Sequence, residues 1–172
     1  PSPLGRVLAV AERLDTLAGG FAAGLKPTGN KDPFALRRNA LGLARTLIEG
    51  DMPLALQPLI AHAVSLLPIK PSADDSTETL VHDLYDFIFD RLRGYYAERG
   101  VPSEQFEAVL AVRPVSLQDF DARLVAIAEF AKLLEAEALA AANKRIRNIL
   151  RKAEDEIPAN VSRARLQDEA EI

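Results

Sequence analysis

The chain has 172 residues, which is enough for one domain of ordinary size or two small ones. Hydrophobic residues make up 48% and charged residues 27%, a balance that favours a packed core over disorder. The absence of cysteine excludes disulfides, thiolate metal sites and a cysteine nucleophile, and no run of about 18 apolar residues predicts a membrane span. Alanine and leucine dominate, and no alternating strand pattern stands out, so we expect an all-α fold.

Three helices are expected in the first 67 residues. From Leu4 to Leu17 apolar residues recur every three or four positions, which predicts a helix with one buried face. The glycines at 19 and 20 are expected to end it. After a loop rich in glycine and proline, Asp32 is expected to cap a second helix, with Pro33 in its first turn. This helix and the next are expected over 33–48 and 53–67.

The segment 68–76 contains two prolines and a polar cluster, so it is the best candidate for a domain boundary or hinge. Asp75, with Glu78 three residues later, is expected to cap a helix that reaches about residue 99. Further helices are expected over 103–112, 116–134 and 135–153, and residues 159–172 are weakly amphipathic.

Two features of the first half could carry chemistry. His62 and His82 lie on separate predicted helices and no His-Glu-x-x-His motif occurs, so ordinary surface or core histidines are the simpler interpretation. The expected helix start at Pro33, with Lys26 and Lys31 nearby, could hold a phosphate. An ordinary capped helix with solvated lysines explains the same residues and is favoured on physical grounds.

Arg91 projects from the apolar face of the helix expected after residue 76. A buried guanidinium must be paired, because an unpaired buried charge costs several kcal/mol. We favour a structural ion pair with Asp119 or Asp121. The alternative is a partly exposed arginine that grips RNA beside Tyr95.

The alanine-rich helix over 135–153 is two-sided. Its expected inward stripe consists of Leu139, Ala142, Ile146, Ile149 and Leu150. Opposite that stripe lie Lys144, Arg147 and Arg151, flanked by Arg145 and Lys152, with Asn143 and Asn148 adding amide groups. Net charge is −4 overall, but residues 143–165 carry seven basic side chains against three acidic ones. Such a face could hold a phosphate backbone, although a solvated charged face is the ordinary explanation.

Several motifs, in order and over most of the chain, resemble the β subunit of bacterial tetrameric glycyl-tRNA synthetase. They are Ala11–Leu17 (AERLDTL), Lys26–Arg38 (KPTGNKDPFALRR), Phe89–Tyr96 (FDRLRGYY), Arg113–Pro114 with Asp119–Arg123 (RP, DFDAR) and Glu137–Leu150 (EALAAANKRIRNIL).

The resemblance implies a truncated, all-helical fragment of two consecutive bundles. Residues 1–67 would be the C-terminal part of an HD-like helical domain, 68–76 a linker, and 77–172 an incomplete DALR-type anticodon-binding domain. Asp15 falls where an HD domain has its last metal-binding aspartate, but one carboxylate cannot form a metal cage, so no metal site is expected. The chain does not begin with methionine, and we expect it to be a cut or processed product.

The resemblance also implies a function. The fragment would bind tRNA(Gly) in the cytoplasm and carry no catalytic residue and no cofactor, because the separate α subunit uses ATP in an α2β2 assembly. The candidate RNA-binding residues are Asn143, Lys144, Arg147, Asn148, Arg151, Arg91, Arg93, Tyr95, Lys31 and Arg37. An alternative is a helical scaffold without RNA contact, and a remote one is a phosphohydrolase remnant that uses Asp15. An uncovered apolar patch could produce an artificial dimer of the fragment.

Overall fold

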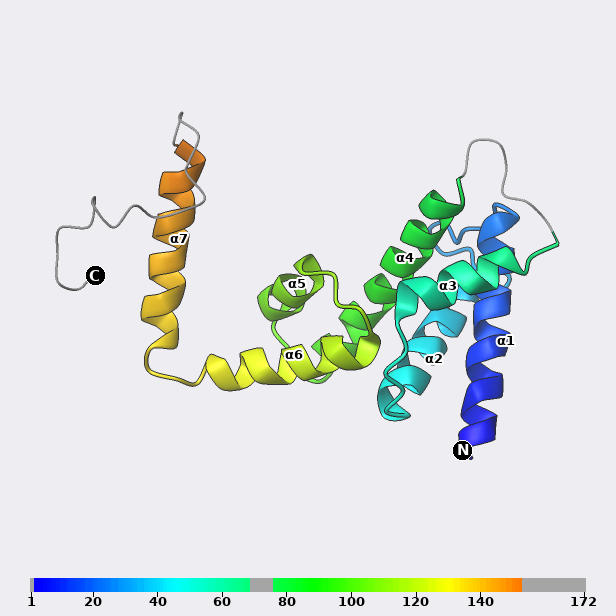
Figure 1. Cartoon of the computed structure of the whole chain (residues 1–172), viewed down its shortest axis with the longest axis horizontal. Coiled ribbons are helices and arrows are strands. Elements are labelled where there is room, and N and C mark those ends of the chain that lie inside the picture. Colours follow the sequence, from blue (N-terminus) through cyan, green and yellow to red (C-terminus); the bar gives the residue numbers. More distant parts are fainter. Residues whose placement is uncertain (1, 69–75, 153–172) are drawn as a thin grey trace, which may run out of the picture. The chain divides into compact units, whose positions relative to one another are not determined.

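The computed structural model describes residues 2–68 and 76–152, and there every regular element is an α-helix (Figure 1). This confirms the predicted all-α class. The helices are α1 (Pro3–Ala22), α2 (Leu36–Glu49), α3 (Leu56–Ser65), α4 (Thr77–Ala97), α5 (Ser103–Ala111), α6 (Leu117–Phe130) and α7 (Ala136–Lys152). The chain divides into two compact units, Pro1–Glu129 and Phe130–Ile172. The expected cap Asp75 and the amphipathic tail 159–172 lie outside the described residues.

Helix α1 runs through the two glycines that were expected to end it. Ser2 caps its start by accepting the Gly5 N–H at 3.2 Å, and the helix continues to Ala22. A Cβ atom at Gly20 would lie 3.0 Å from both terminal methyl groups of Leu36. The glycine therefore permits a close approach between α1 and the start of α2. The prediction of a helix end at Gly19 and Gly20 is wrong: the helix ends at Ala22, and Gly24, with φ 71°, takes the left-handed conformation just beyond it.

Asp32 caps α2 as expected, but the helix begins further from this residue than predicted. Its two carboxylate oxygens accept the N–H groups of Leu36 at 2.8 Å and Arg37 at 3.0 Å. The helix begins at Leu36 rather than at Pro33, because Ala35 takes a left-handed conformation with φ 53°. The loop thus turns once more before the helix starts.

Serine hydroxyls cap two of the later helices. Ser76 accepts the Thr79 N–H at 3.1 Å at the start of α4, and Ser116 accepts the Asp119 N–H at 3.0 Å at the start of α6. Each bond satisfies one of the N–H groups that a helix leaves unpaired at its first turn. Helix α6 ends at Phe130, a few residues before the predicted end.

One hydrophobic core joins all six helices of the first unit. Buried leucines of α1, α2 and α3 pack with Leu84 and Ile88 of α4. At the other end of α4, Phe89 and Phe106 each meet the Phe120 ring, with centroid distances of 5.0 and 5.1 Å. Such edge-to-face aromatic contacts add to the stabilisation from burial. The core therefore continues from the N-terminal helices to α6.

The helices on both sides of the expected hinge share this core. Helices α1, α2 and α3 all contact α4 (Figure 1). The Leu56 N–H at the start of α3 also donates to the Val115 carbonyl at 2.9 Å, which ties the segment before 68–76 to the loop before α6. The expected pair of separate bundles is therefore not confirmed, and the boundaries 1–67 and 77–172 stay predictions.

Candidate nucleic-acid interface

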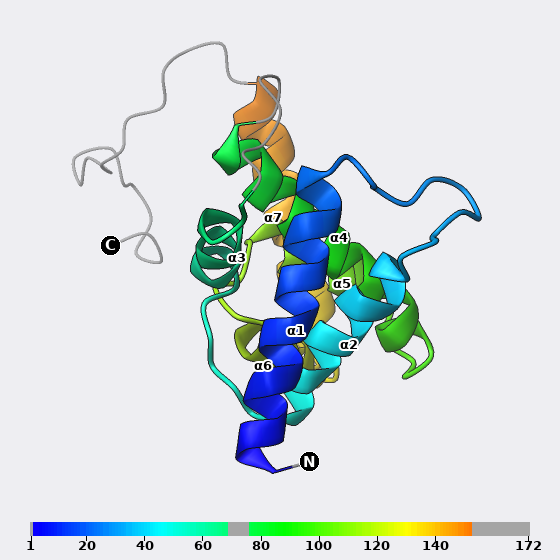
Figure 2. The same cartoon turned by 90° about the vertical axis from the view of Figure 1, so that its right-hand side faces the viewer.

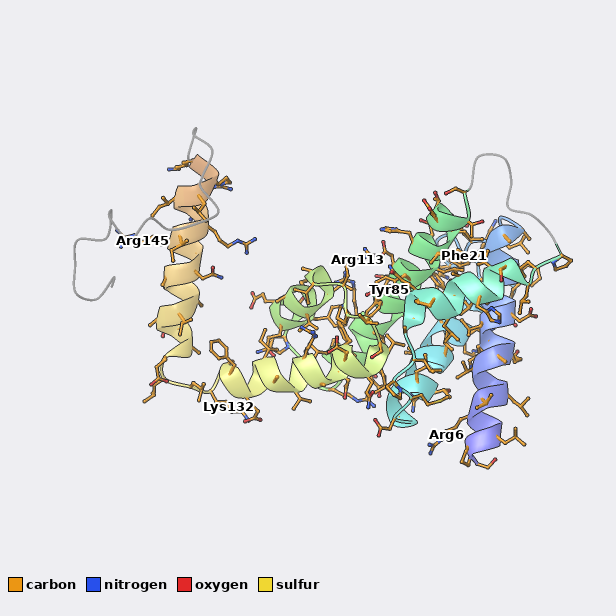
Figure 3. All side chains as sticks on the ribbon, in the orientation of Figure 1. Arg6, Phe21, Tyr85, Arg113, Lys132 and Arg145 are labelled. Atoms are coloured by element: carbon orange, nitrogen blue, oxygen red, sulfur yellow. The ribbon has the colours of Figure 1, made fainter. Side chains whose placement is uncertain are left out.

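Helix α7 presents its cations on one face. At 100° per residue, Lys144, Arg147 and Arg151 fall within a narrow sector, because they are spaced three and four positions apart. All three side chains are exposed, and the same is true of Arg145, which projects from the helix in Figure 3. In the part of the chain that the structure describes, no carboxylate lies within ion-pairing distance of these groups. Within residues 2–68 and 76–152, their charges are therefore available to a partner.

Two asparagines lie on the same face of α7. Asn143 and Asn148 line a surface depression together with Lys144, Arg147 and Arg151. Arg151 Nη2 donates to Asn148 Oδ1 at 3.5 Å, which is a long and weak contact. The arrangement combines phosphate-binding cations with amide groups that can donate and accept hydrogen bonds. The structure thus brings together the five candidate residues of this helix.

The opposite face of α7 is apolar but not buried. Leu139, Ile146 and Ile149 are 59%, 54% and 60% exposed, and in this unit only Ala136 is buried among the described residues. The expectation that this stripe faces an interior is therefore not met by the described residues. A strongly two-sided helix gains little stability alone, because most helical stability comes from packing of the apolar face.

Arg91 on α4 is paired, but not with the expected carboxylates. Its guanidinium contacts the neighbouring Asp90 and lies 5.5 Å from the Phe87 ring centroid. Asp119 instead accepts from Arg123 at 2.9 Å, and Asp121 accepts from the Tyr96 hydroxyl at 2.7 Å. Asp119 and Asp121 are thus engaged by Arg123 and Tyr96 and not by Arg91. Burial lowers the pKa of Arg91.

Arg93 makes a second internal ion pair on α4. Its guanidinium contacts Glu107 of α5, lies 3.3 Å from an Asp90 oxygen and covers the Phe106 ring at 5.2 Å. The pair is about half exposed, so its energy is modest. A phosphate would have to compete with two carboxylates for this guanidinium.

Tyr95 is also engaged within the chain. The Arg99 guanidinium lies 3.4 Å from its ring centroid and that of Arg45 lies 5.7 Å away, while its hydroxyl contacts Glu49 at 3.4 Å. A base that stacked on Tyr95 would have to displace Arg99. The sequence analysis did not identify Arg45 and Arg99 as the arginines that cover the Tyr95 ring. The four-residue spacings Tyr95–Arg99 and Arg45–Glu49 could have indicated these contacts.

Lys31 lies in the loop between α1 and α2, and Arg37 is the second residue of α2. Lys31 is exposed in a tight turn in which its N–H donates to the Thr28 carbonyl at 2.9 Å. Arg37 Nη2 donates to the Gly29 carbonyl at 2.8 Å, and Lys26 pairs with Asp83 at 2.5 Å. The N–H groups at the start of α2 already bond to Asp32. A phosphate at this helix start would have to displace that carboxylate.

The histidines and Asp15 lie on three different helices. Asp15, His62 and His82 are exposed on α1, α3 and α4, and His82 Nδ1 lies 3.2 Å from Asp86. Within residues 2–68 and 76–152, no group of three potential ligands is close enough to hold a metal ion. Over the same residues, no helix combines the length and hydropathy needed to cross a bilayer.

Comparison with known proteins places the chain beside one family. The family model described as "Glycyl-tRNA synthetase beta subunit" matches residues 1–111. The glycine–tRNA ligase β subunit of Xanthomonas campestris pv. campestris (strain 8004) is 66% identical over 172 residues, covering 99% of this chain and 25% of that protein. Those of Xylella fastidiosa (strain M12) and Pseudomonas aeruginosa (strain LESB58) are 52% and 48% identical, each over 99% of this chain and 27% and 25% of their own.

The chain therefore spans about a quarter of the length of the curated relatives it matches. The family model covers more than half of the chain, from α1 to the end of α5, and the similarity to the relatives continues through α6 and α7. On these matches, this chain belongs to the glycyl-tRNA synthetase β-subunit family.

Proposed function

We propose that the chain is a tRNA-binding portion of a glycine–tRNA ligase β subunit. It would contribute recognition of tRNA(Gly) to ATP-dependent aminoacylation, while a separate α subunit activates glycine. The proposed assembly is an α2β2 heterotetramer in the cytoplasm. The names of the relatives support the assignment to this enzyme, and the residues of α7 support the proposed RNA contact.

The basic face of α7, which pairs with no carboxylate among the described residues, is the observation that carries the proposal. Cations that lack carboxylate partners attract an RNA backbone by releasing counterions, without first breaking an internal ion pair. The two asparagines on this face could accept or donate to base edges in a single-stranded loop, where bases are accessible. We expect this arrangement at an anticodon loop, because cations provide affinity for the backbone and amides provide selectivity for bases.

A tRNA titration of the full-length αβ enzyme at several salt concentrations tests the proposal. The double variant Arg147→Ala/Arg151→Ala should weaken tRNA binding about tenfold and reduce the salt slope by roughly 1.4 to 1.8, since each of the two phosphate contacts contributes about 0.7 to 0.9 to the slope. Glycine-dependent ATP–pyrophosphate exchange should stay unchanged, because that step does not require tRNA contact.

Arg123→Ala provides a matched control on α6. Its guanidinium is exposed like those of α7, but it is already bound to Asp119 at 2.9 Å. It should leave both the tRNA affinity and the salt slope within error. The α7 face is not the RNA contact if the double variant behaves like this control.

A second candidate function is subunit interaction without direct RNA contact. The exposed apolar stripe of α7 favours it, because an uncovered stripe of this kind marks a surface that packs against another element. A variant that replaces apolar residues of this stripe and leaves the basic face intact distinguishes RNA binding from subunit interaction. Loss of αβ assembly with unchanged tRNA affinity per assembled enzyme would favour the structural role.

A further inference from the structure

We propose that the outer face of the Arg99 guanidinium stacks against one unpaired nucleobase of the bound tRNA, with the Tyr95 ring as its support. The inference rests on the proposed function, because it takes the ligand to be tRNA. It adds a contact within the first unit to the contact proposed for α7, and the experiment below allows the two to fail separately.

Arg99 lies in the turn that ends α4 and covers the Tyr95 ring. Its N–H donates to the Tyr96 carbonyl at 3.0 Å, and Gly100 behind it takes a left-handed conformation with φ 79°. Its guanidinium carbon lies 3.4 Å from the Tyr95 ring centroid, so it sits directly over the face of the ring. Nη1 also donates to the Tyr95 carbonyl at 3.1 Å. The guanidinium is therefore held over the ring by two kinds of contact.

The Tyr95 ring is itself supported by the fold. It makes an edge-to-face contact with Tyr96, with 5.1 Å between the ring centroids. Tyr96 is 4% exposed and packs against Phe106 and Phe120. On its other side, the Tyr95 hydroxyl contacts Glu49 of α2, the helix that packs against α4 (Figure 2). The stack of Tyr95 and Arg99 is thus formed before any ligand binds, which lowers the entropic cost of binding.

Arg99 has no carboxylate partner in the part of the chain that the structure describes, its neighbour Glu98 included. The carboxylate beside the stack, Glu49, instead accepts from Arg45 Nε at 2.8 Å. Arg99 is exposed, and the Tyr95 carbonyl takes only one of its five guanidinium N–H groups. Its outer face and its other N–H groups are therefore open to a ligand among the described residues.

The shape of the open surface favours a base over a phosphate. A guanidinium is planar and weakly hydrated, so it stacks on flat π systems. Unpaired RNA bases stack on arginine planes as well as on aromatic rings. A phosphate would use the N–H edge of the guanidinium and would gain nothing from the ring beneath it. An exposed guanidinium face over a supported ring is therefore better suited to one base of a single-stranded loop.

Arg99→Lys in the full-length αβ enzyme tests the stack, with tRNA titrated at several salt concentrations. The variant keeps the charge but loses the planar face, so tRNA affinity should fall about fivefold, the effect of losing one stacked base. The salt slope should stay unchanged, because the number of cations is the same. Arg99→Ala removes the face and the charge, and it should weaken binding at least as much as Arg99→Lys does.

Arg38→Lys is the matched control, since Arg38 is an exposed arginine of the same unit that covers no aromatic ring among the described residues. It should leave affinity and slope within error. Tyr95→Phe keeps the supporting ring and should also keep the affinity, whereas Tyr95→Leu removes the ring and should weaken binding about threefold. Thermal melting of each variant checks that the fold is kept.

The stack is overturned if Arg99→Lys binds tRNA as tightly as Arg38→Lys does. If, in that case, Arg99→Ala lowers the salt slope by about 0.7 to 0.9, Arg99 binds a phosphate instead of a base. Either result leaves the α7 proposal intact as long as the Arg147→Ala/Arg151→Ala variant still weakens tRNA binding. If the α7 variant has no effect and Arg99→Lys does, the RNA contact belongs to the first unit.

Discussion

Two tyrosine hydroxyls attach α4 to the segments that follow it. Tyr85 donates to the Pro114 carbonyl at 3.0 Å, with the Arg113 guanidinium 4.6 Å from its ring centroid (Figure 3). Tyr96 donates to Asp121 of α6 at 2.7 Å and is 4% exposed. Both groups are buried and both are satisfied, so each fixes the position of a neighbouring segment as well as filling the core.

Replacing Tyr96 with phenylalanine should lower the free energy of unfolding by about 1 to 2 kcal/mol, because a buried hydrogen bond to a carboxylate is lost. The ring remains, so packing against Phe106 and Phe120 is kept. Urea denaturation of the chain, followed by circular dichroism, measures the change. A difference below about 0.3 kcal/mol would show that solvent replaces the Tyr96–Asp121 bond at no cost.

The same bond predicts how stability depends on alkaline pH. Burial, and then the carboxylate of Asp121, raise the pKa of the Tyr96 hydroxyl well above its usual value. Because the folded-state pKa is raised, the stabilisation is complete below the unfolded-state pKa of about 10 and is lost as pH rises beyond it. The stability advantage of the native chain over the Tyr96→Phe variant should therefore shrink above about pH 10. An advantage that grows with pH would contradict this assignment.

At the scale of the helix, α1 contains two adjacent glycines with different surroundings. A Cβ atom at Gly19 would make an ordinary contact 3.9 Å from Leu67, whereas one at Gly20 would lie 3.0 Å from two methyl groups of Leu36. Leu36 is fully buried and cannot move outward without opening the core. Only Gly20 is therefore required by packing.

The two alanine variants should differ in sign. Gly19→Ala should stabilise the chain by about 0.5 to 1 kcal/mol, since alanine is the better helix former. Gly20→Ala gains the same propensity but overpacks against Leu36, and it should be neutral or destabilising by about 1 kcal/mol. Thermal melts of the two variants measure this difference, and equal shifts would remove the packing explanation for Gly20.

Periodicity and capping residues were sufficient to predict the helices but not all of their ends. The apolar spacing and the Asp32 cap located α1 and α2. Helix α1 ends at Ala22, before Gly24 with its φ of 71°, and not at the two earlier glycines, of which Gly20 packs against Leu36, a neighbour that only the tertiary fold supplies. The pairing of Arg91 was missed for a similar reason, because helix spacing identifies the face of a charge but not which carboxylate lies beside it.

At the scale of the whole molecule, the candidate residues behave differently in the two units. On α7 the predicted residues share one face, as their spacing requires. On α4, Arg93 and Tyr95 are held by Glu107 and Arg99, contacts that depend on how α4 packs and turns. Motif order was sufficient to predict the family because the resemblance spans most of the chain, whereas a residue's freedom to bind depends on its neighbours in space.

The apolar stripe of α7 is uncovered among the described residues, and we propose that the rest of a β-subunit polypeptide packs against it, since this chain spans only about a quarter of its relatives' length. Ile149→Asp should leave the stability of the present chain unchanged, because that side chain is 60% exposed here. In the full-length β subunit the same change should cost about 2 to 3 kcal/mol, the effect of placing a charge in a packed interface. Asn148→Asp, on the basic face, is the control that introduces the same charge without touching the stripe. Chemical denaturation of both variants in both contexts gives the comparison. If Ile149→Asp is harmless in the free β subunit but costly in the αβ complex, the stripe packs against the α subunit instead.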